Sequence, residues 1–171
     1  MKTVMFKWNP AFSSYSMMHY LYDLHHLLEY DEFDYNWSVW DYARIHEGDR
    51  FYWVKVGMYG QTGIVGSGSI ISEPYLDEDW SGKGRETFYV DFRPDVLINP
   101  DALPILTCQE LEQYIPDFEW TKGHSGLVLN EEQASCLDAL WREFIQRNRL
   151  SFAKILDGGR NEDIIYLNKT N

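Results

Sequence analysis

Three short segments each place a tryptophan beside polar side chains that can donate and accept hydrogen bonds. They are Trp8-Asn9-Pro10, Asn36-Trp37-Ser38-Val39-Trp40 and Trp120-Thr121-Lys122-Gly123-His124-Ser125-Gly126. An indole ring offers a flat face for stacking, and polar neighbours can contact the edge of a flat ligand. These residue types therefore favour binding of a planar heterocycle such as a nucleobase. Tryptophans are more often part of a hydrophobic core, so a structural role is the alternative for each of them.

Histidine, cysteine and serine show no spacing that is typical of catalysis. His25 and His26 with Glu29 do not match HExxH, because the glutamate lies outside the histidine pair. The segment Gly66-Ser67-Gly68 is too short for a nucleophile elbow. Neither acidic cluster, at residues 29–34 or 77–79, has the glycine turn of a calcium loop. We predict no catalytic residue, no metal site and no cofactor.

The charge of the chain argues against nonspecific binding to phosphates. The 27 acidic and 15 basic side chains give a formal charge of −12, whereas such binding depends on clustered lysines and arginines. Basic side chains that would form a positive face if they converged in space are Lys2, Lys7, Lys83, Arg85, Arg142, Arg147 and Arg149.

The composition predicts one folded domain in a reducing setting. Of the 171 residues, 44% are hydrophobic and 16% aromatic, enough for a core without disulfides. Cys108 and Cys136 are far apart and have no zinc-finger partners. Lys7 and Pro10 interrupt the apolar start before a signal sequence could form, and no stretch is apolar enough to span a membrane. We expect a cytoplasmic protein without membrane contact.

The elements that would position these residues alternate between strand and helix. Strands are predicted at 3–7, 50–56, 70–71 and 86–93. Residues 57–68 are predicted to form a hairpin turn and a glycine-bearing strand where another backbone or a ligand approaches closely, leading into 70–71. A helix begins after Ser13 or Ser14 with Met17, Leu21, Leu24 and Leu28 on one face. Capping boxes predict helices from Thr107 to Tyr114 and from Asn130 to Arg149. An apolar turn at 150–156 and an apolar run at 164–167 follow. The order predicts an α+β domain whose mixed sheet curls into a barrel.

Two segments carry a resemblance to a known family. Residues 45–57 read Ile-His-Glu-Gly-Asp-Arg-Phe-Tyr-Trp-Val-Lys-Val-Gly, and residues 63–75 read Gly-Ile-Val-Gly-Ser-Gly-Ser-Ile-Ile-Ser-Glu-Pro-Tyr. Together they resemble the pattern of EVE-type domains in the PUA-like superfamily, which is related to YTH, ASCH and SRA domains. Trp120 with Ser125-Gly126 and then 137–141 resembles the ending of related bacterial proteins. The resemblance is specific at 45–75 and loose over the rest of 1–149.

The resemblance implies an α+β fold, a PUA-like mixed β pseudobarrel with flanking helices, over residues 1–149. Residues 150–171 would form a C-terminal extension that packs on this domain or trails from it. Relatives hold a modified nucleobase in an aromatic pocket and mostly read rather than react. With the residue types above, this implies that the ligand-binding residues are Trp8, Asn9, Trp37, Ser38, Trp40, Tyr59, Gln61, Trp120, His124 and Ser125.

Three hypotheses of function follow. The first is a non-catalytic module that binds DNA or RNA through a modified, flipped base, with edge contacts from Asn9 and Ser38. The second is a small-molecule or protein-interaction module on the same barrel, whose acidic surface faces a basic partner; it is favoured if the basic residues scatter. The third is a nucleotide- or RNA-directed enzyme that uses His124 or an acid of 77–79. The sequence does not specify the oligomeric state.

Overall fold

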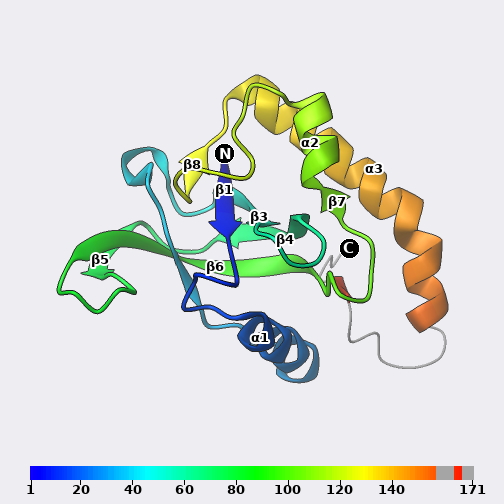
Figure 1. The fold of residues 1–171 in the computed structure, drawn as a ribbon, viewed down its shortest axis with the longest axis horizontal. Helices are drawn as coiled ribbons and strands as arrows, with labels where there is room; N and C mark the ends of the chain where they lie inside the picture. The colour runs from blue at the N-terminus through cyan, green and yellow to red at the C-terminus, as the bar shows by residue number, and fades with distance from the viewer. Residues whose placement is uncertain (157–163, 167–171) are drawn as a thin grey trace.

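The computed structural model describes residues 1–156 and 164–166, and within them nine strands form one sheet (Figure 1). The strand order is β2-β6-β4-β3-β1-β8, while β5 and β9 pair with β6 and β7 pairs with β4. The strands are β1 (Thr3–Trp8), β2 (Asn36–Ser38), β3 (Arg50–Lys55), β4 (Gly63–Ile70), β5 (Tyr75–Glu78), β6 (Glu86–Ile98), β7 (Leu106–Thr107), β8 (Leu127–Val128) and β9 (Ile164–Tyr166). Because β1 and β3 are parallel and the other pairs antiparallel, the sheet is mixed, as predicted.

The sheet curls until its two ends meet. Backbone N–H groups of Trp40 and Asp41, just after β2, donate to the carbonyls of Ser125 and Gly126, just before β8, at 3.0 Å each. This approach requires glycine at 126, where φ is +77° and an added Cβ would lie 2.3 Å from the Cα of Val39. The contact closes the barrel on one side and leaves β1 and β2 apart on the other.

Glycines also allow close contact inside the sheet. At Gly68 an added Cβ would lie 2.1 Å from the carbonyl oxygen of Arg93 on β6. The predicted glycine-rich hairpin, followed by a strand where another backbone approaches closely, is therefore confirmed. Strand β6 continues past the predicted end at residue 93, because Pro94 lies at a register shift opposite Gly68, where a ladder hydrogen bond is not required.

Helix α1 (Met17–Tyr30) packs against β4 and β6, where the Tyr20 hydroxyl lies within hydrogen-bond distance of the carbonyls of Val65 and Ile98. Its cap is Ser16, whose Oγ accepts from the N–H of His19 at 3.1 Å, and not Ser13 or Ser14. Its fully buried residues are Tyr20, Leu24 and Leu27. Of the predicted apolar face, Leu24 is buried, Met17 and Leu21 pack against the core while partly buried, and Leu28 is exposed. Tyr20 is completely buried because its hydroxyl donates to the carbonyl of Ile98 at 2.5 Å, an interaction that helical spacing does not reveal.

The remaining helices are the 3-10 turn η1 (Tyr42–Arg44), α2 (Cys108–Tyr114) and α3 (Glu131–Leu156). Both capping boxes are confirmed: Thr107 accepts from the N–H of Glu110, and the backbone N–H of Gln133 donates to Asn130 while Asn130 donates back to the Gln133 side chain. The predicted turn at 150–156 is wrong, because α3 meets no glycine or proline before Gly158.

The predicted extension adds a strand to the sheet at one point. Ile164–Tyr166 forms β9 and pairs with Val96–Ile98 of β6, while Leu167 of the predicted run lies outside the described residues. The boundary at residue 149 stays a prediction, and α3 crosses it without a break. In the described part of the chain, none of the helices has the length and apolar character needed to cross a membrane.

Candidate ligand pocket

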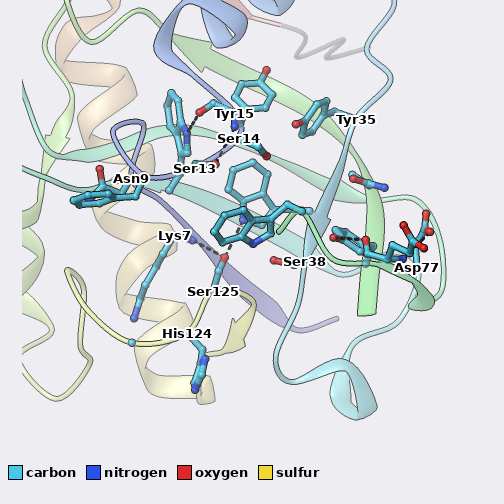
Figure 2. Close-up of a pocket in the computed structure, with 18 residues that line it drawn as sticks. Lys7, Asn9, Ser13, Ser14, Tyr15, Tyr35, Ser38, Asp77, His124 and Ser125 are labelled. Carbon is cyan, nitrogen blue, oxygen red and sulfur yellow. Dashed lines mark hydrogen bonds between the residues drawn. The ribbon is translucent and has the colours of Figure 1, made fainter. Parts of the chain in front are cut away.

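A cavity of about 470 Å³ opens where β1 and β2 separate, and we call it the main pocket (Figure 2). Its walls come from the end of β1, the 9–15 loop, β2, the end of β5 and residues 123–125. The volume falls in the range of small-molecule sites. The same gap between sheet edges that prevents complete barrel closure therefore provides the space for a ligand.

Aromatic rings form the inner wall of the main pocket. Trp8, Tyr15 and Trp37 line it and are almost completely buried. Tyr15 meets Trp8 edge-on at a centroid distance of 5.7 Å and Trp37 at 6.0 Å, while the indole N–H of Trp8 donates to the carbonyl of Tyr15 at 2.7 Å. Behind them Trp53 lies 5.1 Å from Trp37, so the wall is continuous with the core.

Ser125 joins two sides of the main pocket. Its Oγ accepts from the backbone N–H of Lys7 on β1 at 2.9 Å and from the indole N–H of Trp37 on β2 at 2.8 Å. A hydroxyl has two acceptor lone pairs and one donor hydrogen. Both lone pairs are used, and no acceptor for the O–H occurs among the described residues. Ser125 therefore offers a donor to an acceptor atom of a ligand.

Asn36 of β2 lines the opposite wall and is held by a chain of hydrogen bonds that lies outside the lining. The Asn36 side chain donates to the hydroxyl of Tyr75 at 3.0 Å, and that hydroxyl donates to Asp91 at 2.6 Å. Burial, then the hydrogen bond to Asp91, raises the pKa of Tyr75 to about 12. Ser38 also lines this wall, and within residues 1–156 its hydroxyl has no hydrogen-bond partner.

The rim of the main pocket is acidic and aromatic. Asp77, Glu78 and the largely exposed Trp80 lie on it, at the protruding β5–β6 hairpin. Lys7 of β1 also lines the pocket, and its ammonium donates to the carbonyl of Lys122 and lies 5.0 Å from the ring of Phe118. Burial lowers the pKa of Lys7. This rim suits a neutral or hydrogen-bond-donating ligand better than a phosphate.

Six of the ten predicted ligand-binding residues meet in the main pocket: Trp8, Asn9, Trp37, Ser38, His124 and Ser125. Trp40 is outside its lining, 59% exposed, and stacks on the ring of His124 at 3.6 Å. Trp120 is completely buried and its indole N–H donates to the carbonyl of Ile115, so the structure assigns it to the core.

The other two predicted residues lie near a second cavity, also of about 470 Å³, which we call the Lys55 pocket. Tyr59 lines it together with Asn9, which lines both pockets. Gln61 has a structural role, because its side-chain amide donates to the carbonyls of Pro100 at 2.6 Å and Leu103 at 2.8 Å.

Several residues that line the main pocket were not predicted from the sequence. Tyr15, Tyr35 and Lys7 lie on the main pocket. A pattern of a proline followed by two serines and an aromatic could have marked the 10–15 loop as a site, but it also describes an ordinary turn. Among the described residues no group of three or more metal-ligating side chains occurs.

The predicted basic residues do not share one face. Lys83 and Arg85 lie in the β5–β6 turn, whereas Arg142 and Arg147 lie on α3 at the other end of the view (Figure 1). Lys2 is engaged elsewhere, since its ammonium donates to the carbonyl of Arg44 at 2.8 Å. The side chain of Arg149 lies outside the described part. Any nucleic acid would therefore meet only part of this basic set.

Comparison with known proteins identifies the fold. No family model matches the sequence, and no curated protein matches it. The structure is similar to the crystal structure of human THYN1 protein in complex with 5-methylcytosine containing DNA, with a TM-score of 0.52 and 15% identity over 82% of this chain and 97% of that chain. The predicted PUA-like α+β pseudobarrel is thereby confirmed.

Two further solved structures are similar at lower scores. The NMR structure of Rpa0253 from Rhodopseudomonas palustris has a TM-score of 0.49 and 16% identity, and covers 82% of this chain and 92% of that chain. The Mmi1 YTH domain complex with RNA has a TM-score of 0.46 and 13% identity, and covers 86% of this chain and 82% of that chain.

Proposed function

We propose that this chain is a non-catalytic nucleic-acid-binding module whose main pocket holds a modified base flipped out of DNA or RNA. The observation that carries the proposal is the Ser125 hydroxyl, which has a free donor beside the buried aromatic wall of Trp37. A flat ring with an acceptor on its edge uses both features. The similar THYN1 structure contains 5-methylcytosine DNA, which supports this class of ligand by analogy of fold.

The pocket can supply binding energy without many phosphate contacts. Stacking of a base on an aromatic side chain contributes about 1–3 kcal/mol. Because the rim carries Asp77 and Glu78, the base and its edge contacts would provide most of the affinity. The logarithm of the binding constant should then fall with the logarithm of salt concentration with a slope shallower than about −5.

The first experiment is a titration of tryptophan fluorescence. Single-stranded and duplex oligonucleotides, with and without modified cytosine or adenine, are added at two salt concentrations. We expect quenching that depends on the modification and little on salt. Quenching that ignores the modification, or a slope steeper than −5, would contradict base recognition.

Two serine variants test the contacts of the pocket. Ser125→Ala should weaken binding about 10- to 100-fold, because it removes the free donor. It also leaves the N–H groups of Lys7 and Trp37 without their acceptor, so its thermal unfolding must be measured in parallel. Ser38→Ala breaks no internal hydrogen bond within residues 1–156 and tests the opposite wall of the same pocket in an undisturbed fold. Ser69→Ala, at an exposed serine of β4, is the matched control.

A second candidate function has one observation in its favour. The basic residues scatter between the β5–β6 turn and α3, which favours a small-molecule or protein-interaction module with an acidic surface. Quenching by free nucleosides or by a basic peptide, with none by any oligonucleotide, would support it. The enzyme hypothesis has less support, because His124 stacks on Trp40 and forms no hydrogen bond with Ser125 in the described part.

A further inference from the structure

The Lys55 pocket adjoins the main pocket at Asn9. The Asn9 side chain packs against Gly57, where φ is +111° and an added Cβ would lie 2.7 Å from its Oδ1. That oxygen accepts from the N–H of Ala11 at 3.1 Å, while the amide nitrogen has no acceptor among the described residues. The two cavities, each of about 470 Å³, therefore share a wall at Asn9. The amide N–H groups of Asn9 are available there to donate to a ligand.

Lys55 places a buried cation in the wall of the second cavity. Its side chain is 3% exposed, and its ammonium donates to the carbonyls of Tyr59 at 2.6 Å and Gln61 at 2.9 Å. An ammonium has three N–H donors. In the described part of the chain the third has no acceptor, and no carboxylate lies within 4.0 Å. A ligand acceptor would complete this coordination.

Asp101 places an acceptor beside that donor. A Cβ added at Gly60 would lie 3.5 Å from the Lys55 nitrogen and 3.7 Å from the Asp101 Oδ1, so both groups face the same point of the wall. The Gln61 side chain holds the loop that contains Gly60 against the loop that contains Asp101, because its amide donates to the carbonyls of Pro100 and Leu103. The carboxylate disfavours a phosphate here and favours a ligand with adjacent acceptor and donor atoms.

Guanine has that pattern. Its O6 and N7 accept hydrogen bonds, contacts that lysine makes often, and its ring N–H and amino group donate to a carboxylate. Met17, Met58 and Tyr59 supply apolar surface to the same cavity. We propose that the Lys55 pocket is a second base site that holds a guanine adjacent to the base in the main pocket. This inference rests on the proposed function.

The test varies the neighbour of the modified base. Short oligonucleotides carry that base with guanine, adenine, cytosine, thymine or an abasic unit on either side, and binding is followed by tryptophan fluorescence. We expect a guanine neighbour on one side to bind about tenfold more tightly than an abasic neighbour. Equal affinity for all neighbours overturns the second site, and a preference for another base overturns its assignment to guanine.

Variants separate the two sites. Asp101→Asn and Tyr59→Ala, both at exposed positions, should abolish the preference for guanine and leave the affinity for the modified base beside an abasic unit unchanged. Tyr114→Ala, an exposed tyrosine of α2, should keep the preference. Retention of the preference in both pocket variants overturns the proposal. Absence of binding by every oligonucleotide would instead refute the proposed function itself.

Discussion

The two pockets have the same volume and share Asn9, but they are built from different material. The inner wall of the main pocket consists of core aromatic rings, such as Trp37, which is 8% exposed. The wall of the Lys55 pocket includes loop side chains, such as Met58, which is 92% exposed. A ligand in the main pocket therefore contacts the core, whereas a ligand in the Lys55 pocket contacts a surface loop.

Both pockets contain a buried lysine whose ammonium is hydrogen-bonded to the backbone. Lys7 on β1 and Lys55 on β3 are almost completely buried, and these neighbouring parallel strands place Lys7 opposite Val54 and Trp8 opposite Lys55. The Lys55 ammonium donates to two backbone carbonyls and the Lys7 ammonium to one, each in a loop near its own pocket. Buried charges are costly unless they are hydrogen-bonded. We therefore expect each lysine to order one loop through its hydrogen bonds, one loop for each pocket.

Removing one aromatic ring from each pocket should have very different effects on stability. Trp37→Ala should lower the free energy of unfolding by about 3–5 kcal/mol, because it leaves a cavity in the core. Tyr59→Ala should change it by less than about 0.5 kcal/mol, because the side chain is mostly exposed. Urea unfolding measures both values. Equal losses would show that the Lys55 pocket is as much a part of the core as the main pocket.

A smaller effect is expected from the lysines. Lys55→Met removes a charged donor from two carbonyls and should cost about 2 kcal/mol, whereas Lys7→Met, with one carbonyl, should cost about 1 kcal/mol. Hydrogen exchange of amides 57–62 should accelerate in Lys55→Met only. If these amides exchange at the wild-type rate in Lys55→Met, the lysine does not order the loop.

The smallest effect is a difference in response to alkaline pH. The raised pKa of Tyr75 means that its stabilisation of the fold is complete below pH 10 and is lost as the pH rises toward about 12. Burial lowers the pKa of Lys55, so the folded state binds this proton more weakly than the unfolded state does, and stability should rise as pH increases toward the unfolded value of about 10.5.

The measurement is the free energy of unfolding between pH 8 and pH 12 in wild type, Tyr75→Phe and Lys55→Met. Tyr75→Phe should lose less stability than wild type above pH 10, and Lys55→Met should lack the rise below that pH. Parallel curves for all three proteins would contradict both assignments.

Local rules predicted much of the framework. The capping boxes at Thr107 and Asn130 satisfy backbone N–H groups within a single turn, so they act in the same way in any fold. The strand around Trp53 and the glycine hairpin after it were likewise predicted from residue type. The burial of Tyr20 on α1 was not, because its hydrogen bond joins residues 78 positions apart.

Residue types and spacings predicted the class of the fold, the short-range caps and turns, and a set of aromatic and polar residues suited to a flat ligand. They did not predict which tryptophans line a pocket and which fill the core. Trp37 and Trp120 both lie beside polar residues in the sequence, yet one meets Ser125 across the barrel and the other is sealed inside. The physical reason is that burial depends on where the curled sheet closes, and that closure joins segments distant in the chain through Val39 and Gly126.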